Sequence, residues 1–184
     1  ELLQRWNRTY NLTAIRSPRT IVTHHLLDSL TLWPFVGESE ALLDVGSGAG
    51  LPAIPLALTA EQLDAPLVQV VALDAVKKKI AFVQQCVIEL GIRRLLPLVG
   101  RLPAWQANRL FPAIVSRAFA SLADFVRLTE PLLAPGGRWL AMKAGVSAAE
   151  LSDLPPEVRT VAVVPLAVPF LTAQRHVVIL ERVR

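Results

Sequence analysis

Short apolar runs alternate with helix-like patterns along most of the chain. Four of the runs are bounded by turn residues, as expected for strands buried on both faces: Ala41–Val45, Leu67–Leu73, Ala113–Ser116 and Trp139–Met142. After the second run, apolar residues recur every three or four positions and predict a helix that ends at Gly91: Val76, Ile80, Val83, Val87 and Leu90. Strands and helices that alternate in this way predict right-handed crossovers and a parallel sheet.

The second half of the chain carries two helix-start signals. Ser121 can cap a helix over Leu122–Ala134, which contains Pro131 near its end. Ser147 and Glu150 have the spacing of a capping box and predict the start of another helix.

Three further extended runs complete the predicted sheet. Leu95–Val99 is a strand that Pro97 restricts to an irregular or edge position, because proline cannot donate to a ladder. Arg159–Val168 and His176–Val183 follow one another with no helix-length segment between them. They predict an antiparallel pair at the end of the sheet.

A helix precedes the sheet. Its predicted range is Ile21–Trp33, and its apolar residues share one face: Val22, Leu26, Leu30 and Trp33. His24 and Asp28 are neighbours at positions i and i+4. We expect a single domain over residues 1–184, with a helical segment of about residues 1–35 packed on it.

Composition narrows the class of protein. The chain has 184 residues, of which 53% are hydrophobic and 18% charged, so disorder is excluded. Its apolar runs are shorter than the roughly 20 residues that cross a bilayer, and we expect no transmembrane helix and no signal peptide. Cys86 has no cysteine partner, which fits a cytoplasmic protein. We expect a monomer that has lost an N-terminal piece, because Glu1 falls inside a helical pattern.

Positive charge gathers at the start of the chain. The net charge is +4, and the first twenty residues hold four arginines against Glu1: Arg5, Arg8, Arg16 and Arg19. Such a segment fits a polyanionic partner, although a solvated basic surface explains it equally well.

A glycine-rich turn follows the first buried strand. The residues from Asp44 to Leu51 read Asp-Val-Gly-Ser-Gly-Ala-Gly-Leu. Glycines let the backbone turn sharply and admit a ligand close to its amides. The dinucleotide fingerprint needs its third glycine where Leu51 stands, and the turn lacks the Gly-Lys-Ser/Thr ending of a P-loop.

Asp74 ends the second strand, where a carboxylate can accept hydrogen bonds from both hydroxyls of a ribose. Alternatively, it caps the helix that begins near Val76. The glycine turn and this acidic residue together resemble the class I S-adenosylmethionine methyltransferases, as do Pro135-Gly136-Gly137 and the terminal antiparallel pair.

That resemblance implies an α/β, Rossmann-like fold with a mostly parallel seven-stranded sheet, an antiparallel last strand and helices on both faces. It also implies S-adenosylmethionine as cofactor, held in part by the turn and by the second strand: Asp44, Gly46, Ser47, Gly48, Gly50, Leu51 and Asp74.

Blocks along almost the whole chain resemble the RsmG (GidB) family in particular. They are Trp6-Asn7 with Tyr10–Thr13, His25 with Asp28-Ser29, Asp44–Pro52, Ser116–Leu122 and Arg175-His176. The resemblance implies methylation of guanine N7 in bacterial 16S ribosomal RNA, with the small ribosomal subunit as partner. It also places the adenine near Leu102 and Pro103, although relatives often have an acidic residue where Pro103 stands.

The chemistry of guanine N7 agrees with what the sequence lacks. N7 has a free lone pair and no proton to lose, so its methylation needs positioning and no general base. Positioning of this kind can supply roughly 7–11 kcal/mol. The Asn/Asp-Pro-Pro-Tyr turn of many amine methyltransferases is replaced by Ser116–Phe119, and Cys86 is interpreted as an inert core thiol. No metal is expected.

Arg117 is the main substrate-side candidate, because it ends the fourth strand beside the methyl-donor position. Its guanidinium can grip a phosphate, the guanine edge or the cofactor carboxylate, or instead pair with Asp44, Asp28 or Asp124.

Other candidates are more ambiguous. Lys143, Arg175 and Arg16 are candidates for contact with RNA phosphate, or are solvated flanks. His24, His25 and Asp28 are expected to lock the N-terminal helix to the domain, and the role of His176 is open.

Three other functions remain open at this point: a methyltransferase for a small molecule or protein, a non-catalytic RNA-binding module, and a dehydrogenase. The glycine spacing disfavours the dehydrogenase.

Overall fold

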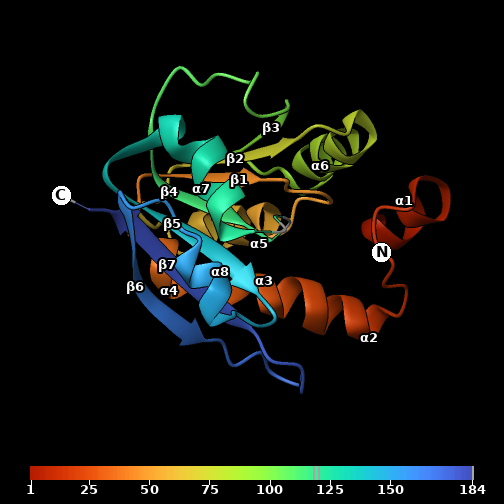
Figure 1. The fold of residues 1–184 in the computed structure, drawn as a ribbon. Helices are drawn as coiled ribbons and strands as arrows, with labels where there is room; N and C mark the ends of the chain where they lie inside the picture. Colours follow the sequence, from red (N-terminus) through yellow and green to blue (C-terminus); the bar gives the residue numbers. More distant parts are fainter. Residues whose placement is uncertain (118, 120, 184) are drawn as a thin grey trace.

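A seven-stranded sheet forms the centre of the protein in a computed structural model, which describes residues 1–117, 119 and 121–183 (Figure 1). The strands lie in the order β3-β2-β1-β4-β5-β7-β6. The first five are parallel, whereas β7 runs antiparallel between β5 and β6. Their bounds are β1 Ala41–Val45, β2 Gln69–Asp74, β3 Leu95–Val99, β4 Phe111–Ser116, β5 Leu133–Lys143, β6 Val158–Pro165 and β7 His176–Arg182.

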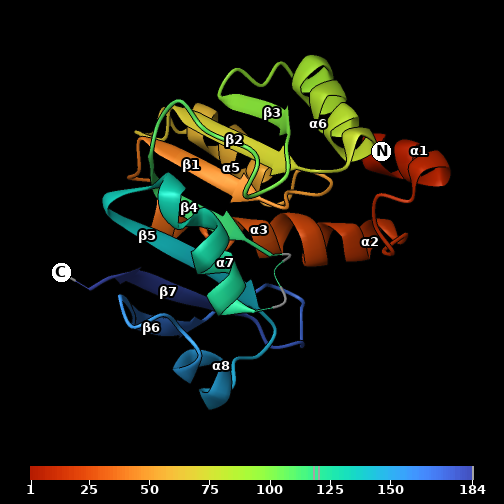
Figure 2. The ribbon, with the colours of Figure 1, turned by 45° about the horizontal axis from the view of Figure 1, so that its top comes forward.

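Helices cover both faces of this sheet. One face packs against α4, α5 and α6 and the other against α7 and α8, and each contact surface is a separate apolar cluster (Figure 2). The bounds are α1 Leu2–Tyr10, α2 Pro18–Ile21, the π-helix η1 Val22–Leu27, α3 Asp28–Leu30, α4 Trp33–Val36, α5 Ala53–Gln62, α6 Lys77–Leu90, α7 Leu122–Thr129, the 3-10 helix η2 Glu130–Leu132 and α8 Ala148–Ser152.

The predicted fold class is confirmed. The sheet is Rossmann-like, the terminal strand pair is antiparallel, and β3 lies at an edge as Pro97 required. Because β1 pairs with both β2 and β4, the strand order reverses beside β1. In open α/β sheets a ligand binds outside the carboxyl ends of the strands at such a reversal.

Several element boundaries were predicted wrongly. The helix expected over Leu122–Ala134 ends at Thr129, and β5 begins at Leu133 rather than near Trp139. Pro131 explains the early end, because it has no N–H to continue the helical bonds. Leu67 is buried but lies ahead of β2, which starts at Gln69.

The helix expected over Ile21–Trp33 is divided among α2, η1 and α3, and the predicted buried face was wrong. Val22 and Leu26 are 45% and 40% exposed, whereas His25, Asp28 and Ser29 are buried. A π-helix turns less per residue than an α-helix, so a stripe drawn at the α-helical period no longer faces the core.

The apolar stripe of α6 was only partly right. Ile80 and Val83 are buried, but Val76 and Leu90 are 37% and 54% exposed. Cys86 lies in the core beside them, and burial raises the pKa of its thiol to about 12. The interpretation of Cys86 as a core residue is therefore confirmed, and the raised thiol pKa disfavours the reactive thiolate.

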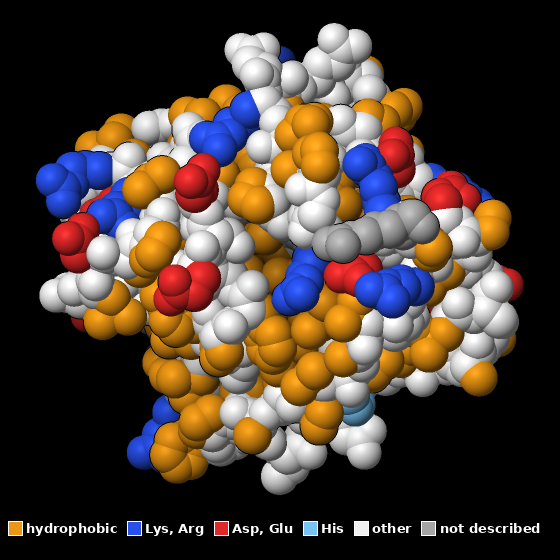
Figure 3. Space-filling model, turned by 90° about the vertical axis from the view of Figure 1, so that its left-hand side faces the viewer, with side chains coloured by type: hydrophobic (Ala, Val, Ile, Leu, Met, Phe, Trp, Pro, Cys, Tyr) orange, Lys and Arg blue, Asp and Glu red, His pale blue; other side chains and the backbone are white. Residues whose placement is uncertain are grey.

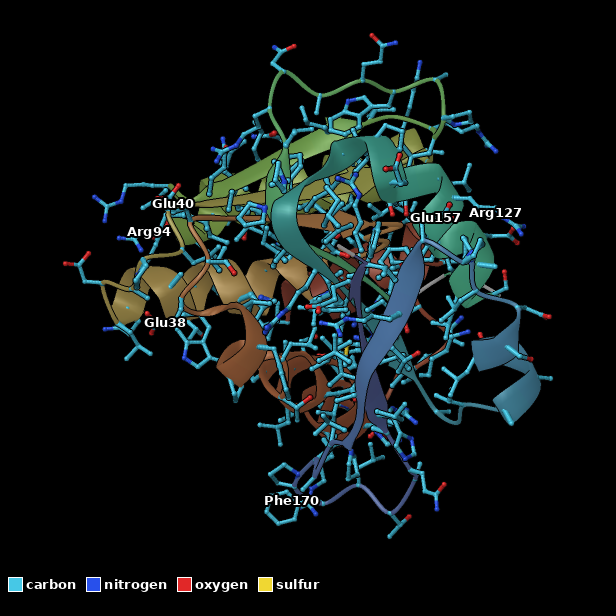
Figure 4. The ribbon with its side chains drawn as sticks, turned by 60° about the vertical axis from the view of Figure 1, so that its left-hand side comes forward. Glu38, Glu40, Arg94, Arg127, Glu157 and Phe170 are labelled. Atoms are coloured by element: carbon cyan, nitrogen blue, oxygen red, sulfur yellow. The ribbon has the colours of Figure 1, made fainter. Side chains whose placement is uncertain are left out.

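The loop between β6 and β7 extends away from the sheet. Its tip carries Phe170, which is 91% exposed and has a positive φ of 64° (Figure 4). Across the described residues, no helix has the length and apolar character that a bilayer crossing requires.

Candidate functional site

The glycine-rich turn folds back over the carboxyl end of β1. Gly46, Gly48 and Gly50 have φ values of 71°, 61° and 76°, a region that favours glycine. The amides of Gly46 and Ser47 both donate to the carbonyl of Leu73, at 2.8 and 3.0 Å. The turn is thereby fixed to the end of β2, and its backbone can approach a ligand closely.

Asp44 supports this turn from beneath. Its Oδ2 accepts hydrogen bonds from the hydroxyl of Ser47 at 2.6 Å and the amide of Ala53 at 3.1 Å. Its Oδ1 has no hydrogen-bond partner among the described residues. Complete burial raises the pKa of this carboxyl to about 7, although Ser47 and Ala53 act in the opposite direction.

Asp74 joins the glycine turn to the loop that precedes α6. Its Oδ2 accepts from the amide of Gly48 at 2.9 Å and its Oδ1 from the amide of Val76 at 2.8 Å. Val76 is the N-cap residue of α6, so the predicted bond to the helix start exists. A carboxylate has about four acceptor positions, so Asp74 can still accept ribose hydroxyls.

A cavity of about 270 Å³ lies between these loops and the face of α7. Of the predicted cofactor residues, Gly46, Asp74 and Leu102 line it. The sequence analysis missed the other lining residues: Val45, Leu73, Ala75, Gly100, Arg101, Phe119 and Leu128. Of these, Gly100 carried a usable signal in the sequence, because it follows β3 directly. In the structure, a Cβ there would lie 2.8 Å from the Leu73 side chain.

The remaining predicted cofactor residues do not line the cavity. Ser47 donates its hydroxyl to Asp44 within the turn, and the amide of Gly48 donates to Asp74 at the end of β2. Leu51 packs on the core. Gly50 allows close packing, since a Cβ there would lie 2.4 Å from Cδ1 of Ile54. Pro103 is exposed beyond Leu102.

Arg117 lies at the end of β4 and turns toward the N-terminal helices. Its guanidinium is 3.3 Å from the Asp28 carboxylate and donates to the His24 carbonyl at 3.3 Å. Arg175 reaches the other oxygen of Asp28, also at 3.3 Å. Of the three acidic partners considered for Arg117, Asp28 is therefore the one it contacts. The Ser116–Leu122 motif also includes Ala118 and Ala120, which lie outside the described residues.

Asp28 is 1% exposed and binds two guanidinium groups, each of which keeps donors free. This group carries a formal net charge of +1 at the edge of the sheet where β4 ends and β7 begins. Guanidinium groups are suited to bind carboxylates and phosphates, so this group could hold an anion.

The other polar candidates have mainly structural contacts. Lys143 pairs with Glu150 at 2.6 Å, and Glu150 also accepts from the amide of Leu122. His25 is buried and its Nε2 lies 2.8 Å from the Thr13 hydroxyl. Burial, and next the charge of Arg117, lowers the pKa of His25.

His176 and Arg16 differ in their surroundings. Nδ1 of His176 is buried and has no hydrogen-bond partner in the described part of the chain. Arg16 is exposed on the connection between α1 and α2. Within the described ranges, no group of three or more His, Cys, Asp or Glu residues is arranged to hold a metal ion.

The cavity fits an adenosyl nucleoside. It lies at the strand-order reversal, a carboxylate and backbone groups form part of its wall, and apolar side chains form the rest. Fold and site together define a class I S-adenosylmethionine-dependent methyltransferase. A crystallised S-adenosylmethionine-dependent methyltransferase from Aquifex aeolicus shares the fold, with a TM-score of 0.66 at 15% identity over 94% of this chain and 97% of that chain.

The particular family follows from the sequence. The family described as "GidB: rRNA small subunit methyltransferase G" matches residues 1–178, and the chain belongs to it. "Ribosomal RNA small subunit methyltransferase G" of Aromatoleum aromaticum is 50% identical over 181 residues, which cover 98% of this chain and 85% of the relative. The protein of the same name from Neisseria meningitidis serogroup C is 48% identical over 99% of this chain and 85% of its own length.

Proposed function

We propose that this protein transfers a methyl group from S-adenosylmethionine to N7 of a guanine in 16S ribosomal RNA. The observation that carries the proposal is membership of the methyltransferase G family over residues 1–178, combined with a nucleoside-sized cavity at the strand-order reversal. The proposed partner is the small ribosomal subunit, and we propose that the chain acts as a monomer.

The residues of the cavity would hold the cofactor. Asp74 would accept the ribose hydroxyls, Gly46 would admit the ligand against bare backbone, and Leu102 would pack on the adenine. S-adenosylmethionine held there would supply a sulfonium methyl group to the N7 lone pair, with the carbon–sulfur bond electrons returning to sulfur and the positive charge passing to the guanine. Since N7 loses no proton, the chain needs to provide orientation and no general base.

Arg117 is proposed to orient the substrate. Asp28 and the His24 carbonyl hold its guanidinium at the end of β4, and its remaining donors can bind a phosphate or the acceptor edge of guanine. Arg175 is proposed as a second phosphate contact, because it shares the same carboxylate. Lys143 is a weaker candidate, since its ammonium is already paired with Glu150.

The test is to map the modified nucleotide. Small subunits that lack the modification are incubated with the protein and with cofactor labelled in its methyl group. We expect label in 16S RNA, at a guanine that becomes sensitive to strand cleavage after borohydride and aniline treatment, as N7-methylguanine is. Label in a protein or small molecule would overturn the proposal, and so would tight binding of S-adenosylhomocysteine with no methyl transfer.

A further inference from the structure

Unneutralised positive charge collects on the N-terminal segment, residues 2–27. This segment contains Arg5, Arg8, Arg16 and Arg19 and no acidic residue. Arg5 pairs with Glu89 at 2.7 Å, but the ion pairs found among the described residues include none of the other three arginines. By contrast, three cations near the carboxyl ends of β4 and β5 are paired with carboxylates: Arg117, Lys143 and Arg175. Arg101, which lines the cavity, is in none of the ion pairs found among the described residues.

Two of the unpaired arginines line one pocket. A recess of about 240 Å³ lies between α1 and the start of α2. Its lining includes two arginines and one side-chain amide residue: the lining residues are Gln4, Asn7, Arg8, Ile15, Arg16 and Ile21. Every charged group in this wall is a cation, so the recess suits an anion of phosphate type.

The walls of the recess are held in place by partly buried hydrogen bonds. The side-chain amide of Asn7 donates to the carbonyl of Thr13 and accepts from its backbone amide, both at 2.9 Å. The Thr13 hydroxyl in turn contacts His25 at 2.8 Å. The connection that carries Arg16 is therefore tied to α1 on one side and to η1 on the other, which lowers the entropic cost of binding.

The recess lies on the same side of the molecule as the proposed methyl-transfer site. The Arg117 guanidinium donates to the His24 carbonyl, so η1 abuts the carboxyl ends of the strands, and α1 and α2 continue outward from there (Figure 1). On the opposite side, acidic and basic side chains are interspersed (Figure 3). A long polyanion at the methyl-transfer site can thus extend onto the N-terminal segment.

We propose that Arg8 and Arg16 form a second contact site for RNA, which binds a backbone phosphate away from the methylated nucleotide. This inference rests on the proposed function and adds a positioning site to it. A phosphate is favoured over an acidic protein segment because Arg8 and Arg16 line one small recess of about 240 Å³ and not an extended groove. Neither arginine is placed near the reacting atoms, so their effect is on RNA affinity.

The test measures binding and catalysis separately in the intact protein. The double variant Arg8→Gln/Arg16→Gln is compared with wild type for binding of protein-free 16S RNA at several KCl concentrations. We expect affinity at low salt to fall on the order of tenfold, and the slope of log affinity against log salt to become shallower by about 0.7–0.9, as the loss of one phosphate contact requires. The affinity for S-adenosylhomocysteine and kcat at saturating RNA should not change.

A matched control removes the same charge elsewhere. Arg127 matches Arg8, because each lies in the last turn of a helix, α7 and α1 respectively. Arg93 matches Arg16, because it lies in a loop; this loop is at the amino ends of the strands, beside Arg94 (Figure 4). Arg93→Gln/Arg127→Gln should bind RNA as wild type does, and Arg8→Lys/Arg16→Lys should restore most of the affinity. Unchanged thermal unfolding of the Gln variant shows that it is folded.

The outcomes separate this inference from the proposed function. If the Gln variant and wild type share one affinity and one salt slope for RNA, the recess is not an RNA site. A defect that appears with assembled subunits and not with protein-free RNA also overturns it, in favour of an acidic ribosomal protein. If wild type binds RNA but methylates none, the proposed function fails while the binding comparison still decides the role of the recess.

Discussion

At the scale of single residues, Asp74 connects the loop and the cavity. Its two carboxylate oxygens accept the amides of Gly48 and Val76, and the same side chain lines the cavity. Asp74 can accept the two loop amides and a ligand hydroxyl at the same time, because a carboxylate can accept more than one hydrogen bond per oxygen.

Asp74→Ala should therefore weaken binding of S-adenosylhomocysteine. The expected loss is about 1–3 kcal/mol, or roughly 5- to 150-fold in Kd, the scale of hydrogen bonds to a charged group. Isothermal titration calorimetry measures it, with Asp153→Ala on the exposed end of α8 as the control. An unchanged Kd would remove Asp74 from the cofactor site.

The buried carboxyl of Asp44 makes stability depend on pH. Its pKa rises from 3.8 to about 7 on folding, so between these values the folded state binds more protons than the unfolded state. The stabilising effect of its protonated form is present below pH 4 and is lost as pH rises through 7. As pH rises across this window, the unfolding free energy of wild type should fall by a few kcal/mol, roughly, relative to that of Asp44→Asn.

Urea unfolding at pH 5, 6, 7 and 8 checks this prediction, and the difference between the two proteins is the quantity of interest because other groups titrate in both. A constant difference over this range would show that Asp44 does not titrate as its burial implies.

At the scale of elements, the glycine turn depends on close packing with α5. Gly50→Ala combines a left-handed φ of 76° with a Cβ 2.4 Å from Ile54, so we expect a loss of about 2–4 kcal/mol. Gly91→Ala, which has φ 65° and nothing within 4 Å, should lose only about 1 kcal/mol. Chemical denaturation of both variants tests this, and equal losses would contradict the packing argument.

The segment from α2 to α3 is anchored through Asp28. Asp28→Asn leaves Arg117 and Arg175 close together without their shared carboxylate, so stability should fall by about 1–3 kcal/mol and kcat should fall more than cofactor affinity. Thermal unfolding and single-turnover methyl transfer measure the two effects. Asp64→Asn, whose carboxylate pairs with Arg94 but is 96% exposed, is the control and should behave as wild type. A wild-type kcat for Asp28→Asn would refute the anchoring role.

The N-terminal helix also shows where prediction from sequence reaches its limit. Apolar periodicity placed Val22 and Leu26 inward, but η1 turns His25 inward instead, together with Asp28 and Ser29. Two of these polar residues contact groups outside their own helix: Asp28 lies 3.3 Å from both Arg117 and Arg175, and His25 contacts the Thr13 hydroxyl. Ser29 donates to the His25 carbonyl within the segment. An apolar stripe cannot reveal such partners.

The sheet and the glycine turn, by contrast, were predictable, because local composition determines them. Asp44, Gly46 and Asp74 were found by their places at strand ends. Phe119 and Leu128 were not found as cavity residues, because the packing of α7 on the sheet brings them there.

At the scale of the whole molecule, cofactor binding and folding stability are linked. A ligand that binds only the folded chain stabilises it by about 2.7 kcal/mol at 100 times its Kd, which for a chain of 184 residues corresponds to roughly 5–10 °C in Tm. S-adenosylhomocysteine should produce this shift and NAD should not. An equal shift with NAD would favour a dehydrogenase instead.

The position of β7 between β5 and β6 has a consequence for synthesis of the protein. β6 precedes β7 in the chain and pairs only with it among the described strands, while Arg175, just ahead of β7, completes the contact with Asp28. A nascent chain that has emerged as far as β6 therefore has a strand with no sheet neighbour and an incomplete anion site. The edge of the sheet and the contact between Arg175 and Asp28 can form only after β7 has been synthesised. Both are therefore expected to form late during synthesis on the ribosome.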